Sequence, residues 1–456
     1  MSYNTNFSER DPLIINDNEK AQNYQVRINE RNQNISQRQC KFLKGCILVS
    51  VGLTIIFFLV NLLVFNLYVN DQMHLSYTVS NTDNLTATWI SNSYSDPNYI
   101  YLEYFKDDND ITQVKAETTI FDTGYSFNRY THRANFIGLN FNTTYKYRYK
   151  TNSYKSDIFT FSTPIFNKSN VNIVLFGDLG LFYGDSRDAI IDYSLSNPTN
   201  FLFHLGDIAY DLNTYFGYIG DIFLSQIQSI TSHIPYMVIP GNHESYDNFS
   251  NYINRFTMPN YITNKNLFYT IEKPPIKMIN LNTEAYYFQS MAPTIQTQLN
   301  FLENELKNTN RIKYPWLITT GHRPMYYGSS DEDDYDKIQS AFEQLFYKYN
   351  VTIYFAAHEN FYQRICPIYN GTCQTGMTNT SNYILSDLKY PINIITGASG
   401  SVEANTKLLP KSFCINSFEG LGFGVINANY SQFKWTQYAI GYDHYYNIDS
   451  MIIDNI

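Results

Sequence analysis

The sequence predicts three parts in series: a single-pass membrane anchor, an all-β sandwich, and an α/β domain with a β-sandwich core flanked by helices. Three observations give this prediction. The first is a charge-free apolar run, the second is a stretch of period-two strands, and the third is a series of apolar strands that each end in a polar turn. Of the 456 residues, 17% are aromatic and only 16% are charged, which excludes a disordered chain. The net charge of -9 argues against a nucleic acid polymer as partner.

The anchor is predicted at residues 45–69, which contain no charged side chain. About 20 apolar residues suffice to cross a bilayer as a helix, whereas the apolar core of a cleaved signal peptide has only about 7 to 15. Arg38, Lys41 and Lys44 precede this run and Asp71 follows it. Basic flanks stay in the cytoplasm. We therefore expect a type II membrane protein with a cytoplasmic tail (residues 1–44) and a lumenal or extracellular C-terminal part.

Two sets of short signals agree with this topology. In the tail, Glu9, Leu13 and Ile14 resemble an acidic dileucine sorting signal, which adaptor proteins read for endosomal and lysosomal delivery; the alternative is a solvated polar tail on a cell-surface protein. Cys366 and Cys373 are close enough in sequence to form a disulfide in an oxidising compartment. Eight N-glycosylation acceptors follow the anchor: Asn84, Asn142, Asn167, Asn248, Asn350, Asn370, Asn379 and Asn429.

The first domain after the anchor is predicted at residues 73–164. Apolar and polar residues alternate in LTATWI (85–90) and TYKYRYK (144–150), where Tyr145, Tyr147 and Tyr149 share one face. The stretch GLNFNTTYKYRY is similar to a tyrosine corner of the fibronectin type III kind. We expect a fibronectin III-like sandwich whose aromatic residues form its core.

The second domain, predicted at residues 171–445, alternates strands with helical stretches. Ligands of such domains bind beyond the C-terminal ends of the strands. Five apolar strands each end in a donor-bearing motif: NIVLFGD (172–178), FLFHLGD (201–207), PYMVIPGN (235–242), PWLITTGH (315–322) and TIYFAAH (352–358).

The side chains at these ends are oxygen or imidazole donors, namely Asp178, Asp207, Tyr210, Asn242, His243, His322, His358 and Asn360. A mixed set of carboxylates, imidazoles and amides without cysteine suits two borderline-hard cations such as Fe, Zn or Mn. Two cations close together need a shared carboxylate. A single strand-end Asp is usually a turn or capping residue, but five such ends in series predict a metal site.

The motifs GDLG, GDIAYD, GNHE, GHRPMY and AHENFYQR resemble the five blocks of the purple acid phosphatases, in the animal-type long-chain branch of the metallophosphoesterase superfamily. The resemblance covers about residues 73–445. It implies that Asp178, Asp207 and Tyr210 hold a ferric ion and that Asp207 bridges to a second metal. It also implies that Asn242, His322 and His358 hold this second ion, which is Zn, Fe(II) or Mn, and that His243 faces the phosphate.

One position departs from the family pattern. The last block of relatives reads His-x-His, and its second His completes the ferric site, but this chain has Asn360 there. An amide oxygen binds hard cations but is a weaker donor than imidazole. Either the oxygen donors suffice and the metal preference changes, or the first site is poorly filled. Gln363, where relatives commonly carry Glu, is a lesser departure.

The resemblance implies an acid phosphatase that hydrolyses phosphate monoesters through a dinuclear centre and a metal-bound hydroxide, and the apolar run predicts that one helix anchors it in the bilayer. Asp207 and His243 are the expected catalytic groups, His243 acting as an acid toward the leaving alcohol. One alternative is a phosphodiesterase or nucleotide hydrolase on the same centre. The other is a non-catalytic glycoprotein, which Asn360 favours.

Overall fold

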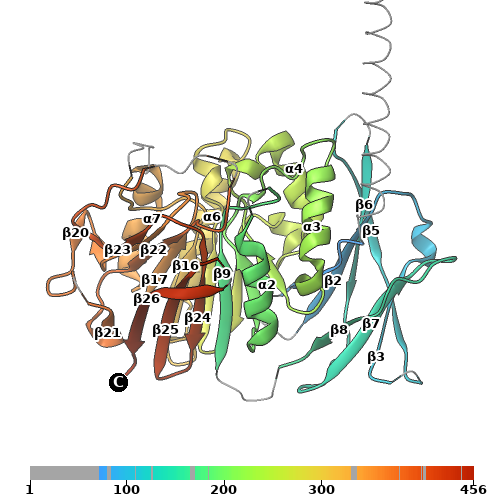
Figure 1. The fold of residues 1–456 in the computed structure, drawn as a ribbon, viewed down its shortest axis with the longest axis horizontal. Helices are drawn as coiled ribbons and strands as arrows, with labels where there is room; N and C mark the ends of the chain where they lie inside the picture. The colour runs from blue at the N-terminus through green and yellow to red at the C-terminus, as the bar shows by residue number, and fades with distance from the viewer. Residues whose placement is uncertain are drawn as a thin grey trace, which may run out of the picture. The chain divides into compact units, whose positions relative to one another are not determined.

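The computed structural model describes residues 71–79, 84–107, 109–124, 127–164, 170–182, 184–329, 336–378, 380–401, 403, 407–442 and 444–456. All of them belong to one compact unit, residues 69–456 (Figure 1). The predicted tail, anchor and sorting signal lie outside the described residues. Among the helices of the described ranges, none is long and apolar enough to cross a bilayer.

The N-terminal domain is a sandwich of two four-stranded antiparallel sheets, which confirms the predicted β-sandwich. One sheet has the order β1 (His74–Tyr77), β2 (Leu85–Ser91), β6 (Asn128–Asn135), β5 (Glu117–Asp122). The other has the order β4 (Thr112–Lys115), β3 (Tyr101–Phe105), β7 (Thr144–Lys150), β8 (Phe159–Ser162). A short 3-10 helix, η1 (Pro97–Tyr99), precedes β3.

Aromatic side chains fill the sandwich because they alternate along its strands. In β7, Tyr145, Tyr147 and Tyr149 are all buried, and Trp89 of β2 stacks on Tyr149 with ring centroids 5.1 Å apart. The Tyr145 hydroxyl accepts a hydrogen bond from the backbone N–H of Asn140 at 2.9 Å, which is the contact of a tyrosine corner.

The second domain contains two seven-stranded sheets, and the predicted strands divide between them. The first sheet has the order β13 (Tyr236–Val238), β11 (Phe201–His204), β9 (Val171–Phe176), β24 (Gly422–Ala428), β25 (Gln432–Ile440), β26 (Tyr445–Asp454), β21 (Asn382–Ile384). The second has the order β14 (Tyr269–Lys273), β15 (Ile276–Asn280), β16 (Trp316–Thr320), β17 (Ile353–Ala356), β22 (Ile392–Thr396), β18 (Tyr362–Ile365), β23 (Cys414–Phe418).

Helices and short elements occupy the connections. The helices are α2 (Ser186–Ser196), α3 (Tyr218–Thr231), α4 (Tyr246–Arg255), α5 (Tyr261–Asn264), α6 (Ile295–Lys307) and α7 (Asp336–Lys348) (Figure 1). The 3-10 helices are η2 (Asn242–Glu244), η3 (Thr283–Tyr286), η4 (Ala292–Thr294) and η5 (Leu385–Asp387). Apolar side chains of α3, among them Phe223 and Leu224, are buried in the same core as the strands of the first sheet.

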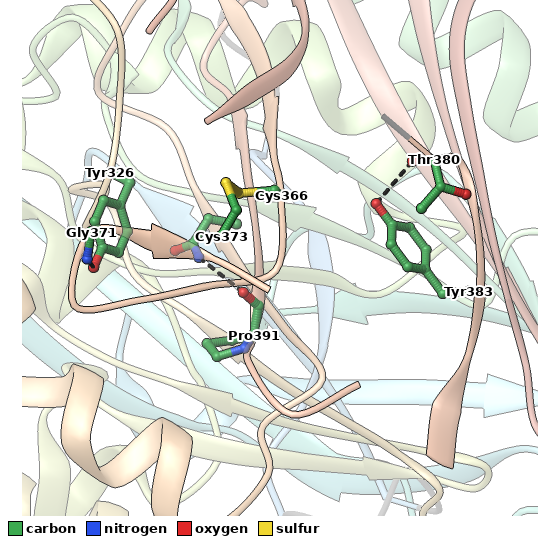
Figure 2. The surroundings of a disulfide bond; sticks show 8 residues. Tyr326, Cys366, Gly371, Cys373, Thr380, Tyr383 and Pro391 are labelled. Atoms are coloured by element: carbon green, nitrogen blue, oxygen red, sulfur yellow. Dashed lines mark hydrogen bonds between the residues drawn. A yellow bond between two sulfur atoms is a disulfide. The ribbon is translucent and has the colours of Figure 1, made fainter. Parts of the chain in front are cut away.

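A disulfide joins Cys366 to Cys373 and closes the small hairpin of β19 (Ile368–Tyr369) and β20 (Thr372–Cys373), as Figure 2 shows. The tip of the hairpin is tied to the loop after β16, because the Gly371 N–H donates to the Tyr326 hydroxyl at 2.9 Å. The hairpin therefore supports the loop that begins with the GHRPMY motif.

The two domains meet through buried charged groups. Asp221 of α3 is fully buried and pairs with Arg129 of β6 and with Arg255 of α4, each at 2.8 Å. Arg133 of β6 also donates to the backbone carbonyl of Asn254 at 2.7 Å. These bonds attach the sandwich to the helices that follow two of the donor-bearing strand ends.

Candidate metal centre

The donors gather because the strands that carry them run in parallel within each sheet. Strands β13, β11 and β9 pair in parallel in the first sheet, and β16 and β17 do so in the second. Parallel strands place their C-terminal ends at one edge of a sheet. Hydrogen bonds then join the two edges, since Gly177 N–H donates to the Thr396 carbonyl at 3.1 Å.

Asp178 and Asp207 lie side by side on neighbouring strand ends. The two-residue strands β10 (Leu179–Gly180) and β12 (Ile208–Ala209) follow them directly and pair in parallel. Both aspartates adopt left-handed backbone conformations, with φ of 58° and 55°. Tyr210 and His358 are also left-handed, with φ of 46° and 69°. Such conformations are costly for residues other than glycine and cluster at functional sites.

Three donor atoms converge on Nε2 of His322. Asp207 Oδ2 lies 3.3 Å from this nitrogen, Asn242 Oδ1 lies 3.1 Å from it and His358 Nδ1 lies 3.2 Å from it. The other ring nitrogen of His322, Nδ1, is 2.7 Å from the Leu205 carbonyl, which can only accept. His322 therefore carries a proton on Nδ1, so that Nε2 can present its lone pair to a cation in the neutral ring. Ligand atoms of Asp207, His322 and His358 all lie within 4.8 Å of one another.

A second group of donors adjoins the first through Asp207. The Tyr210 hydroxyl donates to Asn360 Oδ1 at 3.2 Å, and Asp178 Oδ2 accepts from the His358 N–H at 2.9 Å. Asp178 Oδ1 is buried and has no hydrogen-bond partner within the described part of the chain. A buried carboxylate oxygen without a partner is costly, and a cation would satisfy it. The donors of this second group therefore fit a hard cation.

Glycines make room for the carboxylates. A Cβ atom on Gly241 would lie 2.2 Å from Asp207 Oδ1, and one on Gly397 would lie 2.2 Å from Asp178 Oδ2. Neither distance is compatible with a side chain. The glycine in GNHE is therefore required by the close approach of Asp207.

Burial and mutual electrostatic interaction determine the pKa values of Asp178, Asp207 and His322. Burial and the neighbouring Asp207 raise the pKa of Asp178 well above its usual range. Burial also disfavours ionisation of Asp207, but the His322 imidazolium outweighs it and lowers the pKa of Asp207. Burial opposes protonation of His322, yet Asp207 raises the pKa of His322 to about 10.

His243 is held between two carboxylates beside these donors. Its Nδ1 lies 2.6 Å from Asp211 Oδ1 and its Nε2 lies 2.9 Å from Glu403 Oε1. The His243 ring packs on the Tyr210 ring with centroids 4.4 Å apart, and its backbone N–H donates to Asp207 Oδ1 at 3.0 Å. Burial disfavours the imidazolium, but the hydrogen bonds to Asp211 and Glu403 outweigh burial and raise the pKa of His243 to about 11.

Glu244 is a supporting residue that sequence reasoning did not single out. Its buried carboxylate accepts hydrogen bonds from the N–H groups of Asp207, Ile208 and Gly241 at 2.8 to 2.9 Å. It thereby joins the loops that carry Asp207 and Asn242. Because Glu244 is part of the GNHE motif, its position next to His243 was the available signal.

Arg323 is a second supporting residue that was not predicted. Its Nε lies 3.0 Å from the buried Glu284, and its Nη1 lies 3.0 Å from His358 Nε2. A guanidinium only donates, so His358 accepts through Nε2 in this arrangement. For His358 to bind a cation through Nδ1 as a neutral ring, its proton would have to lie on Nε2, and Arg323 would have to turn away from that nitrogen.

The remaining predicted residues lie at the surface or outside the described ranges. Of the glycosylation acceptors, Asn84, Asn142, Asn248, Asn350 and Asn370 are exposed and Asn429 is half-buried. Asn167 and Asn379, like Glu9, Leu13 and Ile14, lie outside the described residues.

Two sequence families match the chain. Residues 70–163 match the family described as the purple acid phosphatase N-terminal domain, and residues 171–362 match the calcineurin-like phosphoesterases. Acid phosphatase type 7 of Danio rerio is 32% identical over 382 residues, which are 78% of this chain and 84% of that protein.

Other relatives extend the comparison. Probable inactive purple acid phosphatase 1 of Arabidopsis thaliana is 28% identical over 268 residues, covering 53% of this chain and 43% of that protein. The structure of purple acid phosphatase PPD1 from yellow lupin (Lupinus luteus) seeds superimposes with a TM-score of 0.71 at 22% identity. The superposition covers 84% of this chain and 74% of the lupin chain, so the two share a fold.

Proposed function

Because this chain belongs to the purple acid phosphatases and is a metallophosphoesterase-type hydrolase, we propose that it hydrolyses phosphate monoesters at acidic pH through a dinuclear metal centre. The observation that carries the proposal is the convergence of Asp207, Asn242 and His358 on Nε2 of His322 at 3.1 to 3.3 Å. Such a set of carboxylate, amide and imidazole donors suits a divalent transition metal.

The two groups of donors would hold two cations that share Asp207. Asn242, His322, His358 and Asp207 would hold a divalent Zn, Fe or Mn ion, and Asp178, Tyr210, Asn360 and Asp207 would hold Fe(III). Bound cations of this kind polarise phosphoryl oxygens and acidify water. The contribution of the chain is to fix these donors in place, as Glu244 does for the loops that carry Asp207 and Asn242.

His243 would protonate the leaving group. Asp211 fixes one ring nitrogen at 2.6 Å, and the other nitrogen faces the exposed side of the site near Glu403. In the proposed reaction, water attacks phosphorus, the bond between phosphorus and the ester oxygen breaks, and His243 Nε2 supplies the proton that the departing alkoxide requires. No covalent enzyme intermediate is needed.

We further propose that the chain is a type II membrane glycoprotein of the endosome, the lysosome or the cell surface. The support comes from the charge-free run at residues 45–69, the basic residues before it and the exposed acceptors after it. Fusion of the first 70 residues to a fluorescent reporter tests this proposal. Membrane-bound reporter should move from lysosomes to the cell surface when Leu13 and Ile14 become alanine, whereas a reporter that stays unbound would exclude the anchor.

A non-catalytic binding protein is the second candidate, and Asn360 favours it. The residue replaces an imidazole ligand by an amide that already accepts a hydrogen bond from Tyr210. A relative of lower identity is a probable inactive purple acid phosphatase. A phosphodiester or nucleotide substrate on the same donors would require no change in the assigned roles.

Metal content and turnover separate these candidates. The full-length chain, purified in mild detergent without chelator, should contain about two metal ions and hydrolyse p-nitrophenyl phosphate between pH 4 and 7. Asp207→Asn should lose both properties, while Asp188→Asn, a change at an exposed position of α2, should keep them. Less than one metal ion per chain together with no hydrolysis would favour the binding protein.

A further inference from the structure

A hollow of about 300 Å³ lies beside the candidate metal centre. Its lining includes Asp185, Asn360, Gly397, Ser401 and Glu403, and the rest of the lining is small or apolar. Sites for small molecules are concave surfaces in which a few polar groups determine orientation. The lining therefore determines which chemistry fits next to the metal donors.

Three contacts connect this hollow to the donors. Asn360 Oδ1 accepts from the Tyr210 hydroxyl at 3.2 Å. Gly397 abuts Asp178, because a Cβ at Gly397 would lie 2.2 Å from Asp178 Oδ2. Glu403 lies 2.9 Å from His243 Nε2, the nitrogen assigned to protonate the leaving group. A leaving group protonated by His243 Nε2 would therefore lie next to Glu403, at the edge of the hollow.

Asn360 supplies a donor in this hollow. The side chain is only 7% exposed, and its Oδ1 accepts the hydrogen bond from Tyr210, so its amide N–H groups remain to donate to another acceptor. An ester or phosphate oxygen is such an acceptor. The same side chain can therefore face a cation with its oxygen and a substrate with its nitrogen.

The hollow carries negative charge. Its two charged lining residues, Asp185 and Glu403, are both carboxylates, and no Lys, Arg or His is among the described residues that line it. The hydrogen bond from His243 lowers the pKa of Glu403. Carboxylates beside the leaving group attract a cation there and repel an anion.

We propose that the preferred substrates are phosphate monoesters whose leaving alcohol carries a positive charge, of the amino-alcohol or quaternary-ammonium class. The inference rests on the proposed phosphatase function and names its substrate class. The products are inorganic phosphate and the cationic alcohol, whose oxygen takes its proton from His243. Polyanionic esters are poor substrates because their second charge would face Asp185 and Glu403.

Two substrates of the same shape separate the effect of the leaving group's charge from the effect of its size. Phosphocholine and 3,3-dimethylbutyl phosphate have nearly the same shape, but only phosphocholine has a cationic leaving group. For the full-length enzyme in detergent, kcat/KM should be about fivefold higher for phosphocholine, the size expected for a partly exposed ion pair. Added salt should reduce this ratio, because salt screens exposed charges.

Three variants locate the effect. Glu403→Gln and Asp185→Asn should each bring the ratio toward one. The ratio of the two kcat/KM values is compared, rather than one of them, because Glu403 also contacts His243. A change in His243 would alter the hydrolysis of both substrates by the same factor and leave the ratio unchanged. Asp188→Asn removes a carboxylate of α2 that is 81% exposed and does not line the hollow, and it should leave the ratio unchanged.

The outcomes separate this inference from the proposed function. Hydrolysis of p-nitrophenyl phosphate with a phosphocholine ratio of one or less would overturn the substrate class alone. A ratio above one that survives both Glu403→Gln and Asp185→Asn would also overturn it. Failure to hydrolyse any of the three esters, with metal bound, would overturn the phosphatase function and the inference with it.

Discussion

In the proposed dinuclear centre, Asn360 would determine how well the first metal site is formed. Its amide oxygen lies 3.2 Å from the Tyr210 hydroxyl, so an imidazole introduced there would reach the same donors. We expect Asn360→His to raise the iron content per chain and the visible absorbance, because imidazole is the stronger ligand. Metal analysis and the absorbance spectrum measure both, with Asn308→His at an exposed position as control. Unchanged iron and absorbance would show that residue 360 is not a ligand.

Gln363, the second departure from the family pattern, has a structural explanation. The fully buried side chain accepts from Gly328 N–H at 2.9 Å and donates to the Gly328 carbonyl at 2.9 Å. Glutamate in place of Gln363 would direct a carboxylate oxygen at that carbonyl. We expect Gln363→Glu to reduce the free energy of unfolding by roughly 1 to 3 kcal/mol, while metal content stays the same.

Urea denaturation and metal analysis test this pair of effects. Gln344→Glu, at an exposed position of α7, is the control and should be neutral. Loss of metal without loss of stability would contradict a structural role for Gln363.

At the scale of residues, the candidate metal ligands could be predicted from the sequence, but the residues that position them could not. Asp178, Asp207, Asn242, His322 and His358 were predicted because each follows an apolar strand, a local pattern. Glu403 follows no such strand, and it contacts His243 across 160 positions of sequence. Only tertiary structure brings these two residues together, so no local pattern could have revealed the contact.

At the scale of elements, the junction of β6, α3 and α4 depends on one carboxylate. Asp221 is fully buried between Arg129 and Arg255, at 2.8 Å from each. Removing one charge from a buried network leaves its partners uncompensated. We expect Asp221→Asn to lower the free energy of unfolding by about 3 to 5 kcal/mol, measured by urea denaturation.

The surface pair of Arg187 and Asp188 provides the control. Asp188 is 81% exposed, and exposed pairs contribute only about 0 to 1 kcal/mol. An effect of Asp221→Asn as small as that of Asp188→Asn would show that the network does not hold the domains together.

Individual strands could be predicted, because each depends on a local sequence pattern. The predicted strands ending at Asp178, Asp207, Asn242, His322 and His358 are β9, β11, β13, β16 and β17. How these strands divide between two sheets could not be predicted, because it depends on distant pairings. For example, β9 pairs in antiparallel register with β24, about 250 positions away in the sequence. Alternation along a strand indicates which face is buried but not which distant strand completes the sheet.

At the scale of the whole molecule, buried histidines make stability depend on pH. His74 and His132 are each no more than 2% exposed. Burial lowers the pKa of both to about 4 from 6.5. Between these values the unfolded chain binds more protons than the folded chain, so stability is complete above pH 6.5 and is lost as the pH falls toward 4. Protonation linked to each histidine should make the free energy of unfolding roughly 2 kcal/mol lower at pH 5 than above pH 6.5.

His132→Gln tests this account, because glutamine can hydrogen bond to Ser91 and Thr118 as the imidazole does but does not titrate. Urea denaturation at pH 7.5 and pH 5 should show a loss of stability on acidification that is about 2 kcal/mol smaller in the variant. Substituting the exposed His444 by Gln is the control and should leave the loss unchanged. Equal losses in the wild type and in His132→Gln would mean that His132 is protonated in the folded chain, and an enzyme proposed to work in acid would then owe its pH sensitivity to other groups.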